Sequence, residues 1–440
     1  MGRAILHYLP RSASALVLTE CLLTFLLVYL LLAMSTSGSH APVALCNALA
    51  ATLSFTIVAT TLVLSGQSGE SALTCRRLLI TAVAAGFIAL PLISIVPSMI
   101  GIPTYDFGTV LIVWAIWAGV ITSTRTALGV LAERTGPARR VLFIGDASQF
   151  AALNARLGRL GRGRVELLTG EPAQLSFDRL REQNITAIVI TGAAPPAALP
   201  ALLDCKLRGI PVQDHLAFQE HVLGRIEPDA IRAEAIIFGE GYTESWLGRA
   251  LKRSGDIAIA LVLLFLMLPL MLATAVVIKV DTHGPVLYRQ QRVGRHGKTF
   301  TLYKFRSMTL DAEAGGPAWA QKSDPRVTRV GRFIRATRID ELPQLVNVLL
   351  GAMSLVGPRP ERPHFVEQLT TAIPFYHERS YVKPGVTGWA QVNYPYGASI
   401  EDAREKLAYD LYYVKHRSVL LDLYILIDTV RVVLSRDGAR

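Results

Sequence analysis

Hydrophobic residues gather in long runs in the first third of the chain, with polar loops between them. Four runs are each long enough to cross a hydrocarbon core of about 30 Å as a helix: residues 15–34, 43–64, 78–100 and 110–131. Arginines precede the first and third runs and follow the fourth, whereas the loops after the first and third runs contain no Lys or Arg. Because cytoplasmic loops are rich in cations, this pattern predicts a four-helix membrane bundle over residues 1–135 with both ends in the cytoplasm.

The middle of the chain alternates between short apolar strands and helices. "RRVLFIGDASQFAALNARL" has the pattern of a buried strand, a glycine turn and a helix, and a second unit of this kind follows before residue 215. The alternation predicts a parallel sheet, and therefore a cytosolic Rossmann-like domain over residues 136–245. A dinucleotide site requires three glycines after the first strand, but this turn has only Gly145. A structural or regulatory module is thus favoured over one that binds NAD.

A fifth apolar run, at residues 254–281, differs from the other four. Pro269 lies at its centre, where it removes a helical hydrogen bond and kinks the chain, and cations flank both of its ends. These features favour a re-entrant helical hairpin over residues 246–285, hinged at Pro269, which enters and leaves the membrane on the cytoplasmic side. The final helix pattern, at 418–436, interleaves charged and apolar residues and predicts a core-packed or interfacial helix.

Composition and charge narrow the choice of partners. Of the 440 residues 51% are hydrophobic and 18% are charged, which is too apolar for a purely soluble protein and too charged for a membrane bundle alone. The net charge is +11, and the basic residues lie in loops beside apolar segments. We therefore expect membrane lipid and phosphorylated substrates as partners and no nucleic acid. The cysteines lack metal or redox spacing and are predicted to be reduced core residues: Cys21, Cys46, Cys75 and Cys205.

Candidate chemistry begins with two adjacent acids in "RATRIDELPQLVNVLLG". Asp340 and Glu341 precede a short apolar helix pattern that Gly351 can end. As the N-cap of that helix, Asp340 would feel the positive end of the helix dipole and stay ionised. An ionised aspartate can attack phosphorus, and a second acid can hold Mg²⁺. Taken alone, however, an Asp-Glu pair at a helix start also serves simply as a cap.

Cations suited to phosphate binding surround these acids in the sequence. "KTFTLYKFRSM" alternates as a strand, which would place Lys304 and Arg306 on one face, as a diphosphate would require. Arg359 stands between Pro358 and Pro360, whose fixed φ angles preorganise its guanidinium for phosphate. A solvated edge strand and a rigid surface turn remain alternatives for these two segments when each is considered alone.

Taken in series, the motifs resemble the bacterial sugar transferase family, the polyprenyl-phosphate sugar phosphotransferases. The resemblance extends from residue 246 onward and rests on these motifs: K-R-x-x-D at Lys252, Arg253 and Asp256, "YKFRSM", "R-x-x-R-x-D-E-L-P-Q", "N-V-L-x-G-x-M-S-L-V-G-P-R-P-E" and "K-P-G-V-T-G-W-A-Q-V-N". The whole chain is similar to the long members, which add four spans and a Rossmann-like domain. Small members often break the membrane helix at a Ser-Pro pair, whereas this chain has Leu268 before Pro269.

The resemblance implies a catalytic domain of mixed α/β fold over residues 286–440 and an enzyme that transfers a sugar 1-phosphate. The donor would be a UDP-sugar and the acceptor undecaprenyl phosphate, with release of UMP in the first step of exopolysaccharide or related glycan assembly. Asp340 would be the nucleophile that carries the phosphosugar, and Glu341 would coordinate Mg²⁺. Substrate binding would fall to six residues: Lys304, Arg306, Arg335, Arg338, Gln344 and Arg359.

The resemblance also implies a multi-pass protein of the bacterial inner membrane with its active site facing the cytoplasm. Downstream glycosyltransferases and a second copy of the chain are further expected partners. Two other functions stay open at this stage. One is a membrane scaffold or regulator, against which the intact Asp340–Glu341 pair argues; the other is an NAD-dependent modifier of sugar nucleotides, which an absence of NAD binding would dismiss.

Overall fold

The computed structural model describes most of the chain after residue 106 and a few residues near its start: parts of 20–29, then 107–135, 139–159, 165–171, 175–231, 233–239, 241–312, 324–394, 397 and 399–435. The predicted spans at 43–64 and 78–100, and most of the one at 15–34, lie outside these residues. The chain divides into two compact units, Met1–Gly224 and Arg225–Arg440, and each is described here by itself.

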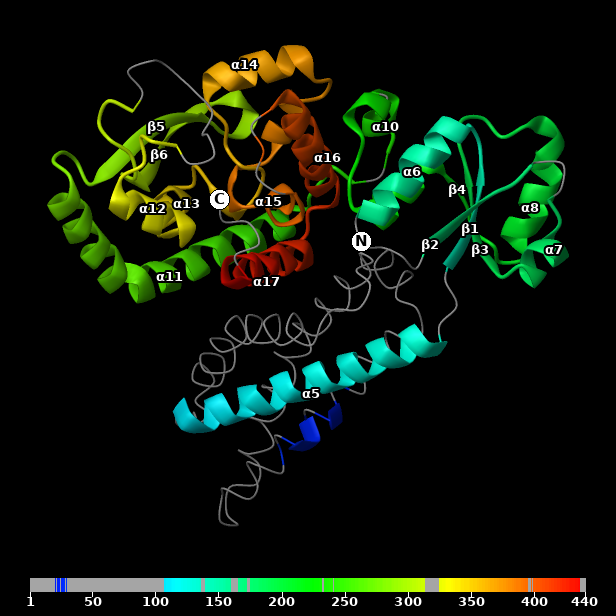
Figure 1. Ribbon diagram of the computed structural model, residues 1–440, viewed down its shortest axis with the longest axis horizontal. Helices are drawn as coiled ribbons and strands as arrows, with labels where there is room; N and C mark the ends of the chain where they lie inside the picture. The colour runs from blue at the N-terminus through cyan, green and yellow to red at the C-terminus, as the bar shows by residue number, and fades with distance from the viewer. Residues whose placement is uncertain are drawn as a thin grey trace. The chain divides into compact units, whose positions relative to one another are not determined.

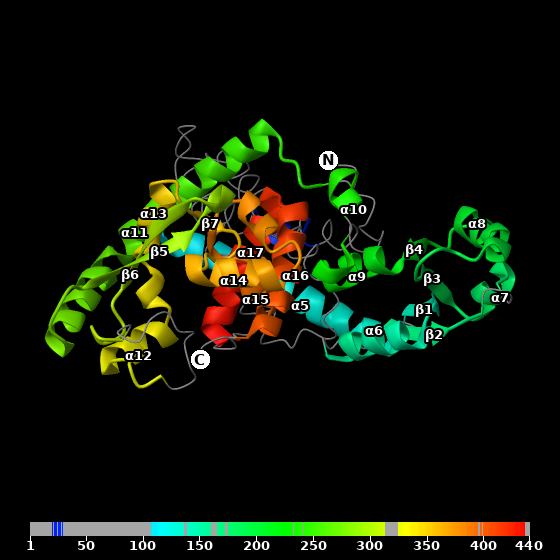
Figure 2. The ribbon, with the colours of Figure 1, turned by 90° about the horizontal axis from the view of Figure 1, so that it is seen from above.

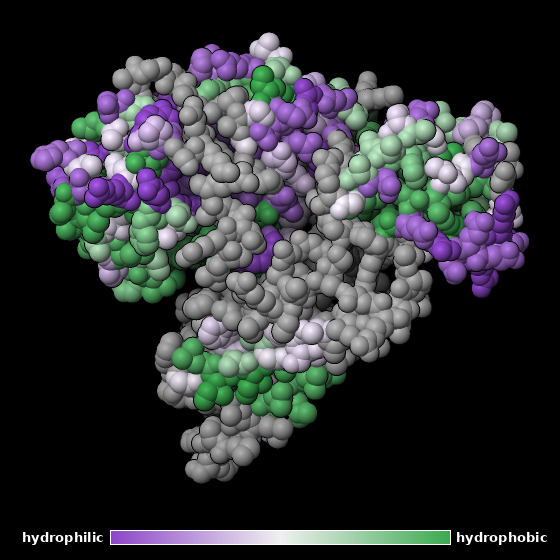
Figure 3. All heavy atoms as spheres, viewed as in Figure 1, coloured by the Kyte–Doolittle hydropathy of each residue, from purple (hydrophilic) through white to green (hydrophobic). Residues whose placement is uncertain are grey.

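The fourth predicted membrane run forms a helix, as the sequence predicts. Helix α5 extends over Phe107–Thr135, with an apolar stretch at Leu111–Thr124. Its surface is largely hydrophobic in Figure 3. The Thr124 hydroxyl donates a hydrogen bond of 3.1 Å to the buried carboxylate of Glu20, so a polar contact joins two apolar segments.

The α/β part of the first unit has a four-stranded, fully parallel sheet in the order β2-β1-β3-β4, which confirms the predicted parallel sheet (Figure 1). Its strands are β1 (Arg139–Ile144), β2 (Val165–Thr169), β3 (Ile185–Ile190) and β4 (Val212–Asp214). Its helices are α6 (Ala147–Arg159), α7 (Phe177–Glu182), the short 3₁₀ turn η2 (Pro196–Ala198), α8 (Leu199–Leu207) and α9 (His215–Leu223).

Alternation along β1 builds a separate core on each face of this sheet. Leu142 and Ile144 pack with residues of α7 and α8, whereas Val141 and Phe143 pack with residues of α6 and α9. This two-sided burial explains why the strands are apolar throughout. Cys205 is fully buried as a free thiol, as predicted, and burial raises its pKa.

The second unit mixes helices with two small sheets. Strands β5 (Leu287–Val293) and β6 (Thr299–Phe305) form an antiparallel hairpin, and β7 (Ser354–Val356) pairs in parallel with β8 (Gly385–Thr387). The α-helices are α10 (Ala233–Ile237), α11 (Trp246–Asp281), α12 (Arg329–Ala336), α13 (Gln344–Leu349), α14 (Pro363–Ala372), α15 (Trp389–Asn393), α16 (Ile400–His416) and α17 (Val419–Ser435). Short 3₁₀ turns are η3 (Pro228–Ala230), η4 (Arg295–Gly297), η5 (Ile339–Glu341) and η6 (His377–Tyr381).

Helix α11 contains the predicted hinge residue. It is a single helix with Pro269 inside it (Figures 1 and 2), and it bends along its length (Figure 1), whereas its re-entry into the membrane stays a prediction. A proline removes one hydrogen bond and bends a helix without ending it when the flanking turns stay intact. The helix is long and apolar enough to cross a membrane, and much of its surface is hydrophobic in Figure 3.

The K-R-x-x-D motif fastens the start of α11 to the rest of the unit. Lys252 Nζ lies 2.6 Å from Asp422 Oδ2 on α17. Arg253 donates to two carbonyl oxygens at the end of α13, and Asp256 accepts from a backbone amide of β7. This motif therefore holds the apolar helix against α13, β7 and α17, and α13 begins shortly after the segment with Asp340 and Glu341. Ile425 on α17 is fully buried in the same core, which confirms that this last helix is packed in the protein.

The segment before α11 belongs to the second unit, although the predicted boundary follows residue 245. Arg225 pairs with Glu405 on α16 at 2.5 Å, and the Tyr242 amide donates to the Lys415 carbonyl oxygen at 3.1 Å. These contacts along α16 explain why the unit begins at Arg225.

Candidate active site

The two acids lie in a tight turn between α12 and α13. Arg338, with a left-handed φ of 59°, precedes the 3₁₀ turn η5, which contains Asp340 and Glu341. Helix α13 begins only at Gln344, with Pro343 at its N-cap position. The prediction that Asp340 caps this helix is therefore wrong, because both acids lie in the 3₁₀ turn that precedes the helix.

Glu341 is the centre of a cluster of cations. Its Oε1 atom lies 2.8 Å from Arg359 Nη2, 3.1 Å from Lys304 Nζ and 3.8 Å from Arg338 Nη1. Burial alone would raise the pKa of Glu341, but Arg359 and Lys304 lower it well below its usual range. Glu341 is thus expected to stay ionised, and it pairs with cations from three segments of the chain, at residues 304, 338 and 359.

Asp340 behaves differently from its neighbour. Burial, followed by the charge of Glu341, raises its pKa to about 6, although Lys304, Arg359 and Arg335 oppose the rise. The expected effect of a helix dipole is absent because Asp340 does not cap α13. The carboxylate is still mostly ionised at pH 7, and its Oδ1 atom is buried without a hydrogen-bond partner in the described chain. A buried, incompletely solvated carboxylate is a reactive oxygen nucleophile.

Asn347 sets the register between the acids and Lys304. Its side-chain oxygen accepts from the Tyr303 amide at 3.0 Å, and its side-chain nitrogen donates to the Thr301 carbonyl oxygen at 2.7 Å. These two bonds fasten α13 to β6, so that Lys304 reaches Glu341. The sequence analysis missed this role. The available signal was a single asparagine inside the apolar helix pattern, because such a residue needs hydrogen-bond partners when it is buried, as Asn347 is.

The structure brings most of the predicted substrate-binding residues to one place. Lys304, Arg338 and Arg359 contact Glu341, Arg335 acts on the pKa of Asp340, and Gln344 is buried at the start of α13.

Arg306 is the exception among these residues. It lies just beyond β6, which ends at Phe305, so the prediction that Lys304 and Arg306 share one strand face is wrong. Its guanidinium donates to the carbonyl oxygens of His283 at 2.6 Å and Thr282 at 2.9 Å, directly after α11. The predicted part of each residue in substrate binding stays a prediction.

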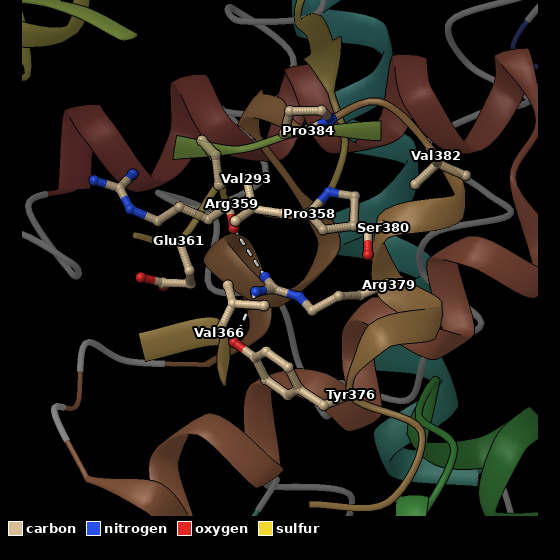
Figure 4. Close-up of a pocket in the computed structure, with 12 residues that line it drawn as sticks. Val293, Pro358, Arg359, Glu361, Val366, Tyr376, Arg379, Ser380, Val382 and Pro384 are labelled. Atoms are coloured by element: carbon tan, nitrogen blue, oxygen red, sulfur yellow. Dashed lines mark hydrogen bonds between the residues drawn. The ribbon is translucent and has the colours of Figure 1, made fainter. Parts of the chain in front are cut away.

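A pocket lies beside the turn that carries Arg359 (Figure 4). Pro358 and Pro360 line it, together with valines from other segments. The guanidinium of Arg379 lies between the backbone of Arg359 and the hydroxyl of Tyr376 and donates hydrogen bonds to both (Figure 4). Burial raises the pKa of Tyr376 to about 12, so its hydroxyl stays protonated at any physiological pH.

Comparison with known proteins points to one family. The model of the family described as bacterial sugar transferase matches residues 247–436. A UDP-N-acetylgalactosamine-undecaprenyl-phosphate N-acetylgalactosaminephosphotransferase of Aeromonas hydrophila is 45% identical over 239 residues, which are 54% of this chain and 56% of that protein. The UDP-glucose:undecaprenyl-phosphate glucose-1-phosphate transferase of Escherichia coli (strain K12) is 43% identical over 188 residues, which are 42% of this chain and 40% of that protein.

A shorter relative is covered almost completely. The exopolysaccharide production protein PSS of Rhizobium leguminosarum bv. phaseoli is 43% identical over 195 residues, which are 42% of this chain and 96% of that protein. The match therefore takes in nearly all of this short protein but only about half of the Aeromonas protein. The chain belongs to the bacterial sugar transferase family, which confirms the resemblance of its motifs.

Proposed function

We propose that this protein is a membrane phosphoglycosyl transferase, which moves a sugar 1-phosphate from a UDP-sugar to undecaprenyl phosphate and thereby starts the assembly of an exopolysaccharide or related glycan. The observation that carries the proposal is the Asp340–Glu341 pair, in which one acid is clamped by cations and the other keeps a buried oxygen without a partner. The names of the relatives, which specify undecaprenyl-phosphate sugar phosphotransferases, support it.

The proposed reaction has two displacements at one phosphorus atom. An Asp340 oxygen bonds to the β-phosphorus of the UDP-sugar, the bond from this phosphorus to the bridging oxygen breaks, and UMP leaves with the electron pair. The phosphosugar is then an acyl phosphate on Asp340. A phosphate oxygen of undecaprenyl phosphate attacks the same phosphorus, and the Asp340 carboxylate leaves. The bond between the sugar and its phosphate survives both steps.

The cations around Glu341 would stabilise charge in both steps. Lys304 and Arg359 hold Glu341 at 3.1 and 2.8 Å, and Arg338 is nearby on the exposed side. Phosphoryl transfer depends mainly on positioned positive charge, because negative charge is spread over the phosphoryl oxygens in the transition state. Glu341 would keep these cations in place between turnovers, when no phosphate is bound.

The two acids also suit Mg²⁺. This ion prefers carboxylate oxygens and usually binds through one or two carboxylates together with substrate phosphates. Asp340 Oδ1 is buried without a partner, and Glu341 is adjacent in the same turn. Among the described residues no three His, Cys, Asp or Glu side chains form a cluster, so phosphate oxygens of the donor would have to complete the coordination. Bound there, Mg²⁺ would neutralise charge on the diphosphate.

The apolar helix α11 would bring the site to its lipid substrate. Arg253 fastens this helix to the end of α13, the helix that follows the turn with the two acids, and its exposed surface is largely hydrophobic (Figure 3). We propose that α11 enters the inner membrane from the cytoplasm. A soluble donor and the phosphate of a lipid acceptor can then meet at the interface.

The test is UMP release by the purified full-length protein in nanodiscs, supplied with Mg²⁺, undecaprenyl phosphate and single UDP-sugars. The panel includes UDP-glucose, UDP-galactose and UDP-N-acetylgalactosamine. A donor labelled with ³²P at the β-phosphate should transiently label the protein, and Asp340→Asn should abolish both the label and UMP release.

The control is Asp311→Asn, which removes a charge from an exposed position of the same unit. This variant should keep the wild-type rate. A folded wild-type protein that releases no UMP from any of these donors would refute the proposed reaction, and an Asp340→Asn variant with full activity would remove Asp340 from it.

A further inference from the structure

A second buried charge cluster lies behind the turn that carries Arg359. Arg379, in the short turn η6, donates through Nη2 to the backbone carbonyl oxygen of Arg359 at 2.9 Å and through Nη1 to the Tyr376 hydroxyl at 2.9 Å. Its Nε atom donates to Asp410 Oδ2 at 3.0 Å, and its Nη2 atom lies 2.7 Å from the same oxygen. Figure 4 shows this guanidinium between the Arg359 backbone and Tyr376.

Both partners of this ion pair are almost inaccessible. The side chain of Arg379 is 12% exposed and that of Asp410, on α16, is 2% exposed. Burying two charges is costly, and well-packed apolar residues are often as stable in such a place. A gain in stability therefore does not by itself explain why Arg379 and Asp410 are both charged and buried. A need to hold the Arg359 backbone in one position does explain it.

Arg379 can hardly act on a ligand directly. Four contacts to protein atoms occupy Nε, Nη1 and Nη2, so little donor capacity is left for a molecule in the neighbouring pocket. The atom that it holds is the backbone oxygen of Arg359. The side chain of this same Arg359 reaches Glu341 Oε1 at 2.8 Å. One residue thus connects the buried pair to the acids.

Resting on the function proposed above, we propose that Arg379, held by Asp410, is a positioning residue that keeps the Arg359 guanidinium beside the Asp340–Glu341 pair. Three successive carbonyl oxygens of this turn accept hydrogen bonds: that of Pro358 from the Gly385 amide, that of Arg359 from Arg379 and that of Pro360 from Arg292. Of these three donors, Arg379 is the one that binds Arg359 itself. Its planar guanidinium is suited to bind a carboxylate, a hydroxyl and a carbonyl oxygen at once.

Displacing Arg359 would have a characteristic effect on turnover. Its Nη2 atom lies 2.8 Å from Glu341 Oε1, where a cation would stabilise the phosphoryl group in the transition state. Loss of an interaction that is made mainly in the transition state lowers kcat and leaves the donor KM nearly unchanged, whereas loss of donor binding raises KM.

The test measures kcat and the donor KM for UMP release in wild type, Arg379→Lys and Asp410→Asn, all as full-length protein in nanodiscs at one pH. Lysine keeps the charge but cannot bind three acceptors in one plane. We expect kcat to fall about tenfold or more while the donor KM changes by about threefold or less, because the displaced cation acts mainly in the transition state. Each variant should still show a cooperative melting transition, which excludes unfolding as the cause.

The matched control is Arg225→Lys, which alters another buried arginine pair on the same helix, with Glu405 at 2.5 Å. It should leave kcat and KM unchanged. A folded Arg379→Lys variant with the wild-type kcat would overturn the proposal, as would a rise in KM without a fall in kcat or an equal loss of kcat in the Arg225→Lys control. Loss of the wild-type melting transition in both Arg379→Lys and Asp410→Asn would show that the pair serves folding, which also overturns it. A wild-type protein without UMP release would instead refute the proposed function.

Discussion

Replacing Asp340 with asparagine is expected to stabilise the folded protein at alkaline pH while it abolishes transfer. Burial and the charge of Glu341 raise the pKa of Asp340 from an ordinary 3.8 to about 6. The folded state therefore disfavours the ionised carboxylate, and above pH 6 this group lowers the free energy of unfolding. At about 1.4 kcal/mol per pKa unit, the loss is about 3 kcal/mol.

The sign of the shift fixes how this effect depends on pH. Below about pH 4 Asp340 is protonated in the folded and unfolded chain alike, so it costs nothing; the cost grows up to about pH 6 and is constant above it. Asparagine has the same shape without the charge, so Asp340→Asn should match the wild type near pH 4. At pH 8 it should melt about 6–12 °C higher, since about 1 kcal/mol corresponds to about 2–4 °C in a unit of this size.

The assay is thermal unfolding of the full-length proteins in one detergent, at a fixed scan rate, at pH 4 and pH 8. Glu341→Gln is the matched companion and should shift the melting temperature downwards at pH 8, because Lys304 and Arg359 would stay buried without their shared carboxylate, at a cost of about 3–5 kcal/mol. The exposed substitution Asp311→Asn should change little. An Asp340→Asn protein that melts at or below the wild-type temperature at pH 8 would refute the electrostatic reasoning.

Two further predictions concern the framework of the site. Lys252→Ala should lower the free energy of unfolding by about 3 kcal/mol in a denaturant titration, because Asp422 would stay buried without its cation. Gly357→Ala should abolish the native near-UV circular dichroism or lower the melting temperature strongly, because an added Cβ would lie 2.3 Å from the Lys383 carbonyl oxygen and the backbone would have to shift.

Each of these predictions has a control at a less buried or less crowded position. Arg208→Ala removes a cation from an exposed pair with Asp178 and should cost about 1 kcal/mol or less, so an equal loss in both variants would contradict the argument from burial. Gly255→Ala adds a Cβ where no atom lies within 4 Å and should be neutral or slightly stabilising. A Gly357→Ala protein as stable as Gly255→Ala would show that the turn is not tightly packed.

Local sequence patterns are enough to predict many of the elements and to single out the residues of the candidate site. The unbroken apolar run in "RRVLFI" is enough to predict a buried strand, and β1 is buried on both faces. The charges inside 418–436 are enough to predict a core-packed or interfacial helix, and α17 buries Asp422 and Ile425. The pair Asp340 and Glu341 could be singled out because its residue types and its position in a series of motifs need no three-dimensional information.

Only the tertiary structure decided which charges meet. Lys304 and Arg306 are equivalent by periodicity, yet one reaches Glu341 and the other binds carbonyl oxygens after α11. Arg379 and Asp410 carry no local signal at all, because their contact joins segments that are 31 residues apart. The pKa of Asp340 likewise depends on burial and on groups from other elements. Periodicity reports the neighbours of a residue along the chain, whereas desolvation and charge pairing depend on groups that only packing brings together.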